Sequence, residues 1–157
     1  MSKTLDETVH TVRRISAELR PGVLDDLGLA AAIEWQARDF QARSSVSCAI
    51  RVPEEDLRLN RDQATALFRI FQESLTNVAR HAQATKVWVN LSEEEDTVVL
   101  EVEDNGVGIS PARLAERRSL GLLGMRERVA VFGGEIEFAG GLGQGTVVVV
   151  RMPVFKN

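Results

Sequence analysis

Residues 98–108 read VVLEVEDNGVG, an alternating strand that ends in a carboxylate followed by two glycines. Apolar residues at every second position indicate a strand with one face in a core. Gly106 and Gly108 lack side chains, so a flat ring can approach the backbone beside Asp104, whose carboxylate can accept from an exocyclic amine. Asp, Asn and Gly are also ordinary turn residues, so the stretch alone fits a plain turn as well.

The segment before this strand predicts a long helix and a second alternating strand. Asn60 followed by Gln63 resembles a capping box, and apolar residues recur at helical spacing from there to about Ala82. Residues 86–93 alternate as a strand does. The acidic run 93–96 is predicted to be a solvated hairpin turn and not a metal site, because adjacent turn carboxylates do not converge on one ion.

The flanking segments complete one sheet and its helices. Residues 46–52 alternate and predict a strand, and residues 121–133 predict a helix closed by two glycines. Residues 135–139 and 146–154 predict two further strands joined by a glycine-rich turn. The order of elements predicts an α+β fold, a two-layer sandwich in which a five-stranded mixed sheet carries helices on one face.

The N-terminal segments predict two helices separated by a break. In residues 1–20, Leu and Val recur at spacings near a coiled-coil seam, although a short amphipathic helix lying on its own domain is the alternative. Pro21 and Gly22 end that helix. Asp25 and Asp26 are expected to cap the second one.

Composition excludes several classes of protein. The chain has 157 residues, a net charge of −4 and a pI near 5.3, so no overall basic field exists to attract nucleic acid or an anionic membrane. One cysteine, Cys48, excludes an internal disulfide framework and a multi-cysteine zinc site. The sequence has no signal-peptide pattern and no apolar run long enough to span a bilayer, so a cytoplasmic location is expected by default.

Polar residues form a line on the predicted long helix. At about 100° per residue, Glu73, Asn77 and Arg80 fall roughly opposite the apolar stripe. An ordinary solvent-exposed face would give the same pattern, so this line indicates a binding site only together with the glycine clusters that follow it.

Two further glycine clusters lie downstream. Residues 121–125 (GLLGM) stand at a predicted helix start, where free N–H groups and the helix dipole favour phosphate, although a glycine-containing helix start is also ordinary. Residues 140–146 resemble a dinucleotide fingerprint, but a strand follows them and not a helix, so the Rossmann interpretation fails. A β-hairpin turn is expected there.

Taken in order, these motifs resemble the N box and three glycine boxes of the Bergerat ATP-binding fold of gyrase-type, chaperone, mismatch-repair and histidine-kinase ATPases. The resemblance covers about residues 60–153. Residues 71–82 and 121–128 are similar to sensor histidine kinases of the nitrate/nitrite-responsive class, and residues 19–29 to that class's junction between dimerisation helices and catalytic domain. His10, followed by Thr11, departs from the family's phosphoacceptor, a His followed by Asp or Glu.

The resemblance implies three parts: residues 1–20, the end of a dimerisation helix; residues 21–45, the junction and first helix of the catalytic domain; and residues 46–157, the ATP-binding domain. It implies a lid at residues 109–120, in which Arg113, Arg117 and Arg118 are candidate cations, although a solvated loop explains them equally well.

The resemblance also implies roles for single residues. Asp104 would bind the adenine amino group with Thr146 near the base, Asn77 would bind Mg²⁺, and Glu73 would act beside that ion as a base or by orienting water. Arg80 and His81 would face the phosphates, although a hydrogen bond at the helix end is an equal alternative for His81. The implied ATP-binding residues are Asn77, Arg80, His81, Asp104, Gly106, Gly108, Gly121, Leu122, Gly124, Met125, Gly145 and Thr146.

The implied reaction is transfer of the γ-phosphoryl group of ATP to a histidine on a dimerisation helix absent from this chain, for relay to a response regulator. The whole protein would be a homodimer, and this chain would be unable to phosphorylate itself alone. Two alternatives stay open, an ATP hydrolase of the chaperone or gyrase kind and a nucleotide-dependent binding module resembling an anti-sigma factor.

Overall fold

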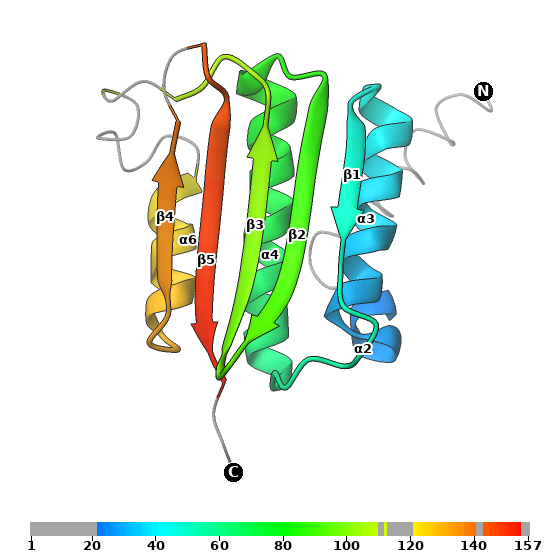
Figure 1. Ribbon diagram of the computed structural model, residues 1–157, viewed down its shortest axis with the longest axis vertical. Helices are drawn as coiled ribbons and strands as arrows, with labels where there is room; N and C mark the ends of the chain where they lie inside the picture. The colour runs from blue at the N-terminus through cyan, green and yellow to red at the C-terminus, as the bar shows by residue number, and fades with distance from the viewer. Residues whose placement is uncertain (1–21, 110–111, 113–120, 141–142, 155–157) are drawn as a thin grey trace, which may run out of the picture.

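The computed structural model describes residues 22–109, 112, 121–140 and 143–154 (Figure 1). The helix predicted at residues 1–20 lies outside the described residues. In chain order the elements are α2 (Gly22–Leu27), α3 (Leu29–Ser44), β1 (Ser47–Arg51), α4 (Arg61–Asn77), the π-helical turn η1 (Val78–Ala82), β2 (Lys86–Glu94), β3 (Thr97–Asp104), α6 (Leu122–Ala130), β4 (Glu135–Ala139) and β5 (Thr146–Pro153).

One five-stranded sheet organises the molecule, with strands in the order β1-β2-β3-β5-β4. β1 pairs with β2 in parallel, and the other three pairs are antiparallel. Helices α3, α4 and α6 all lie on one face of the sheet (Figure 1). The predicted α+β two-layer sandwich with a mixed sheet is therefore confirmed.

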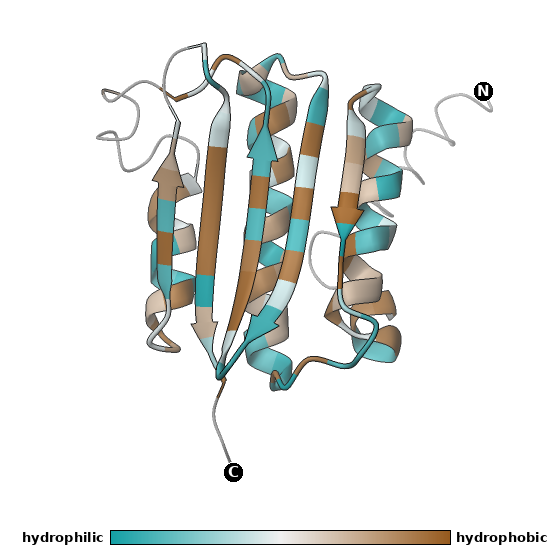
Figure 2. Ribbon diagram, in the orientation of Figure 1, coloured by the Kyte–Doolittle hydropathy of each residue, from teal (hydrophilic) through white to brown (hydrophobic). Residues whose placement is uncertain are grey.

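The core lies between this helical layer and the sheet. Hydrophobic and hydrophilic residues alternate along β2 and β3 (Figure 2), and Val98, Leu100 and Val102 are buried on the helical side. Phe71 of α4 packs against them in one continuous core, which also includes Ile33 of α3. Burying each such side chain stabilises the fold by about 1.5–3 kcal/mol.

The start of α4 has the predicted capping box. The Gln63 amide donates to Asn60 Oδ1 at 2.8 Å, and the Asn60 amide donates to Gln63 Oε1 at 3.2 Å. The Gln63 side chain is 1% exposed and donates through Nε2 to the Pro153 carbonyl at 2.8 Å. The same residue therefore caps α4 and joins it to the end of β5, which fixes the helix relative to the sheet.

The predicted start of the second helix is wrong. Asp25 and Asp26 lie within the short helix α2, and the N-cap of α3 is Gly28, which makes no side-chain cap hydrogen bond. Gly28 adopts a φ of 90° and donates its amide to the Leu24 carbonyl at 3.2 Å. Glycine adopts such a φ without steric cost, so the chain turns a corner here and forms two helices.

The acidic run between β2 and β3 is a hairpin turn, as predicted. β2 and β3 pair along their whole length up to Glu94 and Thr97. Arg58, from the connection before α4, donates to Glu93 at 3.2 Å and contacts Asp96 at 3.4 Å. These exposed ion pairs contribute little to stability but explain how the connection lies against the turn.

Candidate functional site

The ends of α4, η1 and β3 and the start of β5 lie at one end of the molecule (Figure 1). Residues of these elements line a small cavity. Its apolar wall includes Leu122, Phe138 and Val148, and its polar side chains come from α4, η1, β3 and β5. The cavity is lined by Ser74, Asn77, Val78, His81, Ala82, Val102, Asp104, Gly108, Ile109, Leu122, Phe138, Thr146 and Val148.

Asp104 is the buried carboxylate of this cavity. It is the last residue of β3 and is 6% exposed, and its Oδ1 accepts from the Gly106 amide at 2.8 Å. Burial raises the pKa of Asp104 above its ordinary value, and the hydrogen bonds from the Gly106 and Thr146 amides act in the opposite direction. A carboxylate accepts about four hydrogen bonds, so Asp104 keeps capacity for a donor on a ligand.

Asn105 holds the segment that follows Asp104. Its Oδ1 accepts from the amides of Thr85 at 2.9 Å and Lys86 at 3.0 Å, and its Nδ2 donates to Thr85 Oγ1 at 2.8 Å. These bonds join the end of β3 to the start of β2. Sequence reasoning treated Asn105 only as a turn residue and missed this role.

The long helix ends in a π-helical turn, which the sequence analysis did not predict. Residues 78–82 form η1, and the Ala82 carbonyl accepts from the Val107 amide at 2.7 Å. Gly106 packs so closely that a Cβ there would overlap the same carbonyl. The π turn therefore lies where the helix end contacts the segment 106–108. π turns often occur at functional sites.

β4 and β5 pair as antiparallel neighbours, as the expected hairpin requires, and the described glycines of the third cluster lie against the first cluster. The Gly143 amide donates to the Val107 carbonyl at 2.7 Å. Gly145 has a φ of 75°, and a Cβ on it would overlap the Asp104 carbonyl. Glycine at position 145 is thus required by both the backbone conformation and the contact.

The second cluster starts α6. Gly121 is the N-cap with a φ of 68° and makes no side-chain cap hydrogen bond, and Leu122 is 2% exposed and lines the cavity. A Cβ on Gly121 would overlap the Glu73 carboxylate, so that carboxylate lies at the start of α6. Gly124 follows in the first turn, and the Met125 side chain is buried in the core.

The structure brings half of the twelve implied ATP-binding residues into the cavity lining. These are Asn77, His81, Asp104, Gly108, Leu122 and Thr146. Gly106 and Gly145 support the backbone behind Asp104, whereas Arg80 is exposed and outside the lining. Of the implied lid at residues 109–120, only Ile109 and Ala112 are described, and Arg113, Arg117 and Arg118 lie outside the described residues.

Sequence reasoning missed Ser74, Val78 and Phe138. Ser74, Asn77, Val78 and His81 follow the i, i+3, i+4, i+7 spacing of one helix face, which was the available signal. That face is centred about 90° from the position of Glu73 on a helical wheel of about 100° per residue. The cavity therefore uses a face roughly a quarter turn away from the predicted polar line.

No helix among the described residues has the length and apolar character that crossing a membrane requires.

Comparison with solved structures supports the fold. The chain aligns with the Erythrobacter litoralis EL346 blue-light activated histidine kinase at a TM-score of 0.73 and 20% identity. The alignment covers 97% of this chain and 50% of that one. The catalytic domain of histidine kinase ThkA aligns at a TM-score of 0.67 and 17% identity over 80% of this chain and 90% of that one.

Comparison with curated proteins extends to the sequence. The chain is 32% identical over 154 residues to the oxygen sensor histidine kinase NreB of Staphylococcus carnosus, covering 98% of this chain and 43% of that protein. It is 36% identical over 157 residues to the sensor histidine kinase MctS of Rhizobium johnstonii, covering 99% of this chain and 34% of that protein. The chain thus spans less than half of each relative.

The family comparison matches residues 62–156 to the family described as histidine kinase-, DNA gyrase B- and HSP90-like ATPase. That range contains all four motifs and the whole cavity lining. The chain therefore belongs to this ATPase family, and its fold is that of a histidine kinase ATP-binding catalytic domain.

Proposed function

We propose that this domain binds ATP with Mg²⁺ in the cavity at Asp104 and positions the γ-phosphoryl group for transfer to a histidine of the whole protein. The observation that carries the proposal is Asp104 itself, a buried carboxylate at the end of an apolar cavity with unused acceptor capacity. The amides of Gly106 and Thr146 use only part of that capacity, and a ligand with an amino group would supply a further donor.

The adenine ring would pack against the apolar part of this cavity. Val102, Val148 and Phe138 line it, and aliphatic and aromatic side chains suit the two faces of a flat heterocycle. The adenine amino group would donate to Asp104, and the Thr146 hydroxyl, also buried, would act next to it. Gly108 would let the ring approach the backbone.

The phosphates would extend from the base toward the end of α4 and the start of α6. Gly121 and Gly124 would offer amides of the first turn of α6, and His81 and Arg80 would supply donors from η1. Met125, buried in the core, would hold that turn in place without touching the nucleotide.

The residues present suit Mg²⁺, which prefers oxygen ligands and keeps several waters. Asn77 lines the cavity and has an amide oxygen, and Glu73 stands one helical turn before it. When bound, the ion would neutralise charge on the phosphates. Asn77 would bind the ion directly, and Glu73 would contact it through a water molecule.

In the transfer itself, an imidazole nitrogen of the acceptor histidine would bond to the γ-phosphorus as the bond to the β–γ bridging oxygen breaks and ADP leaves. The imidazole proton would pass to a base, and Glu73 is the candidate within this chain. We propose that the acceptor lies on a dimerisation helix of the whole protein, a cytoplasmic homodimeric sensor, which then passes the phosphoryl group to a response regulator.

The test is calorimetric titration of the full chain with a non-hydrolysable ATP analogue and Mg²⁺. Loss of a hydrogen bond to a charged group costs about 1.5–3 kcal/mol, so Asp104→Ala should weaken binding at least tenfold. Glu103→Gln, which changes the exposed neighbour on the other face of β3, should bind as the original chain does. Equal affinity for all three chains would contradict the assignment.

A further inference from the structure

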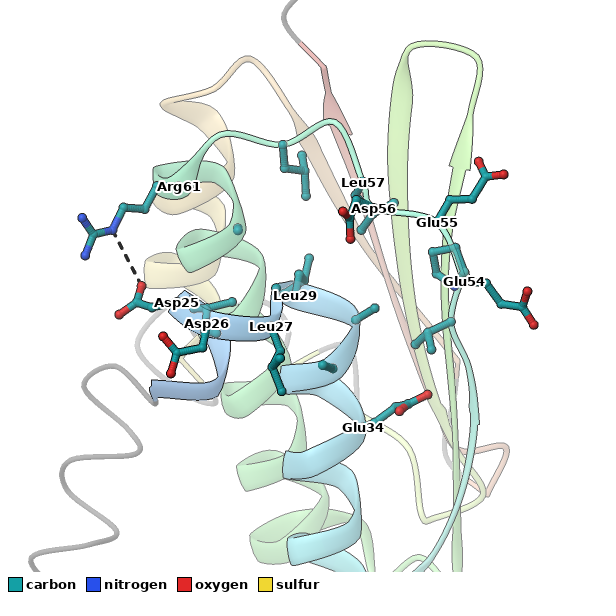
Figure 3. A pocket seen from close by; sticks show the side chains of 18 of the residues that line it. Asp25, Asp26, Leu27, Leu29, Glu34, Glu54, Glu55, Asp56, Leu57 and Arg61 are labelled. Carbon is teal, nitrogen blue, oxygen red and sulfur yellow. Dashed lines mark ion pairs between the residues drawn. The ribbon is translucent and has the colours of Figure 1, made fainter.

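A second cavity, larger than the one at Asp104, lies at the corner where α2 meets α3. It has a volume of about 900 Å³ and is bounded by α2, by the first turns of α3 and by the connecting segment 52–61 (Figure 3). It shares no lining residue with the cavity at Asp104. We call it the α2–α3 groove.

Apolar side chains line the interior of the α2–α3 groove. Leu27 and Leu29 extend from the helical side, and Leu57 extends from the connecting segment (Figure 3). Leu27 is 68% exposed, although it is the last residue of α2 and stands beside the Gly28 corner. An exposed leucine inside such a groove is surface that a partner can bury.

The rim of the groove is strongly negative. Its lining includes six carboxylates, Asp25, Asp26, Glu34, Glu54, Glu55 and Asp56, and one cation, Arg61. Arg61 Nε lies 3.7 Å from Asp25 Oδ1, so that cation is already paired. Among the described residues, none of the other five carboxylates forms an ion pair, which leaves a net negative rim around the leucines.

We propose that the α2–α3 groove binds a basic amphipathic helix of a partner protein. The apolar stripe of such a helix would cover Leu27 and the exposed part of Leu57, beside the buried Leu29, and its Lys and Arg residues would face the carboxylates. A helix fits better than an added strand, because β1 ends at Arg51 and the lining begins only at Val52. The groove therefore offers side chains and not a strand edge.

The size of the groove agrees with this occupant. A helix is about 10 Å across and rises about 5.4 Å per turn, so one face of a helix of two or more turns can lie in a groove of about 900 Å³. Other occupants fit less well. An anionic membrane would be repelled by the carboxylates, and no group of three His, Cys, Asp or Glu among the described residues is placed to hold a metal ion.

The experiment is an NMR titration of the full chain with a designed peptide of about 14 residues, in which Leu recurs at helical spacing and Lys and Arg flank the Leu stripe. A scrambled peptide of the same composition is the control. We expect chemical-shift changes confined to α2, the start of α3 and residues 52–61, and affinity that falls at least threefold between about 0.05 and 0.3 M salt.

Two pairs of variants test the apolar and charged parts separately. Leu27→Asn should weaken binding at least threefold, whereas Val131→Asn, at a position 79% exposed near the end of α6, should not. The combined change of Asp26, Glu34 and Asp56 to their amides should weaken it at least fivefold. The matched change of Glu101, Glu103 and Glu135, on the open face of the sheet, should leave it unchanged.

Three results would overturn the proposal. They are equal binding of the scrambled peptide, shift changes centred on another surface, and equal affinity of the Leu27 and Val131 variants. Binding of anionic vesicles at the same residues would also overturn it. All of these readouts are independent of nucleotide, so a failed groove would leave the proposed ATP site untouched.

Discussion

Removing the Asn105 side chain tests how the candidate site is held in position. In Asn105→Ala, two backbone amides and one hydroxyl lose their partners, at Thr85 and Lys86. Asp104 keeps its own hydrogen bond from Gly106, so the variant changes the support of the carboxylate and not the carboxylate itself.

The structure gives the size of the expected effect. Three hydrogen bonds at about 0.5–1.5 kcal/mol each set an upper limit of about 4.5 kcal/mol. Thr85 and Asn105 are exposed, so water can replace the lost partners, and we expect the free energy of unfolding to fall by about 1.5–2 kcal/mol. If half of that loss also appears in ATP binding, the affinity falls about four- to fivefold.

Urea unfolding followed by tryptophan fluorescence measures the first quantity, and calorimetric titration with an ATP analogue measures the second. Asn105→Asp keeps the acceptor for both amides and should recover most of the affinity. Asn90→Ala, on the open face of β2, is the matched control and should change neither quantity. An Asn105→Ala chain with unchanged stability and unchanged affinity would refute the reasoning.

Four further predictions concern the site, the implied lid and the acceptor histidine. Gly106→Ala would force a Cβ onto the Ala82 carbonyl, so we expect the free energy of unfolding, measured with urea, to fall by at least about 3 kcal/mol. A fall of less than about 1 kcal/mol would contradict the contact. Burial raises the pKa of Asp104, so its contribution to stability is present below the ordinary carboxyl pKa and lost as pH rises through the folded pKa. In urea unfolding at about pH 7, Asp104→Asn should therefore be at least as stable as the original chain, even though it binds ATP less tightly. A less stable variant would show that the charge of the Asp104 carboxylate does not destabilise the fold. Residues 109–120 should gain hydrogen-exchange protection when an ATP analogue and Mg²⁺ are added, and unchanged protection at saturation would count against a lid. Incubation with γ-labelled ATP should leave the chain without acid-labile label, and stoichiometric label on His10 would show that the acceptor has been misidentified.

Local rules predicted most of the fold because its elements follow their own sequence patterns. The pairing of Asn60 with Gln63 identified the start of α4, and strict alternation identified β2 and β3. The corner at Gly28 was missed, because Asp25 and Asp26 are favourable capping residues and nothing local shows that the chain turns after Leu27.

The site was less predictable because the hydrogen bonds that hold it in place join residues far apart in the sequence. The motif residue Asp104 could be recognised, but the bond from Val107 to the Ala82 carbonyl joins segments that only the folded chain brings together. The π-helical turn η1 accompanies that contact, and helical periodicity carries no signal for it. The same limit applies to Asn105, whose partners lie 19 and 20 residues earlier in the chain.

These contacts also explain why the glycines of the first and third clusters stand where they do. The Val107 backbone donates to the Ala82 carbonyl and accepts from the Gly143 amide, so one residue joins the end of the helix to the β4–β5 turn. Gly106 and Gly145 pack against the carbonyls of Ala82 and Asp104, where a Cβ would not fit. The spacing of the glycines therefore follows from three backbones meeting beside Asp104, and a ligand bound there would contact all three at once.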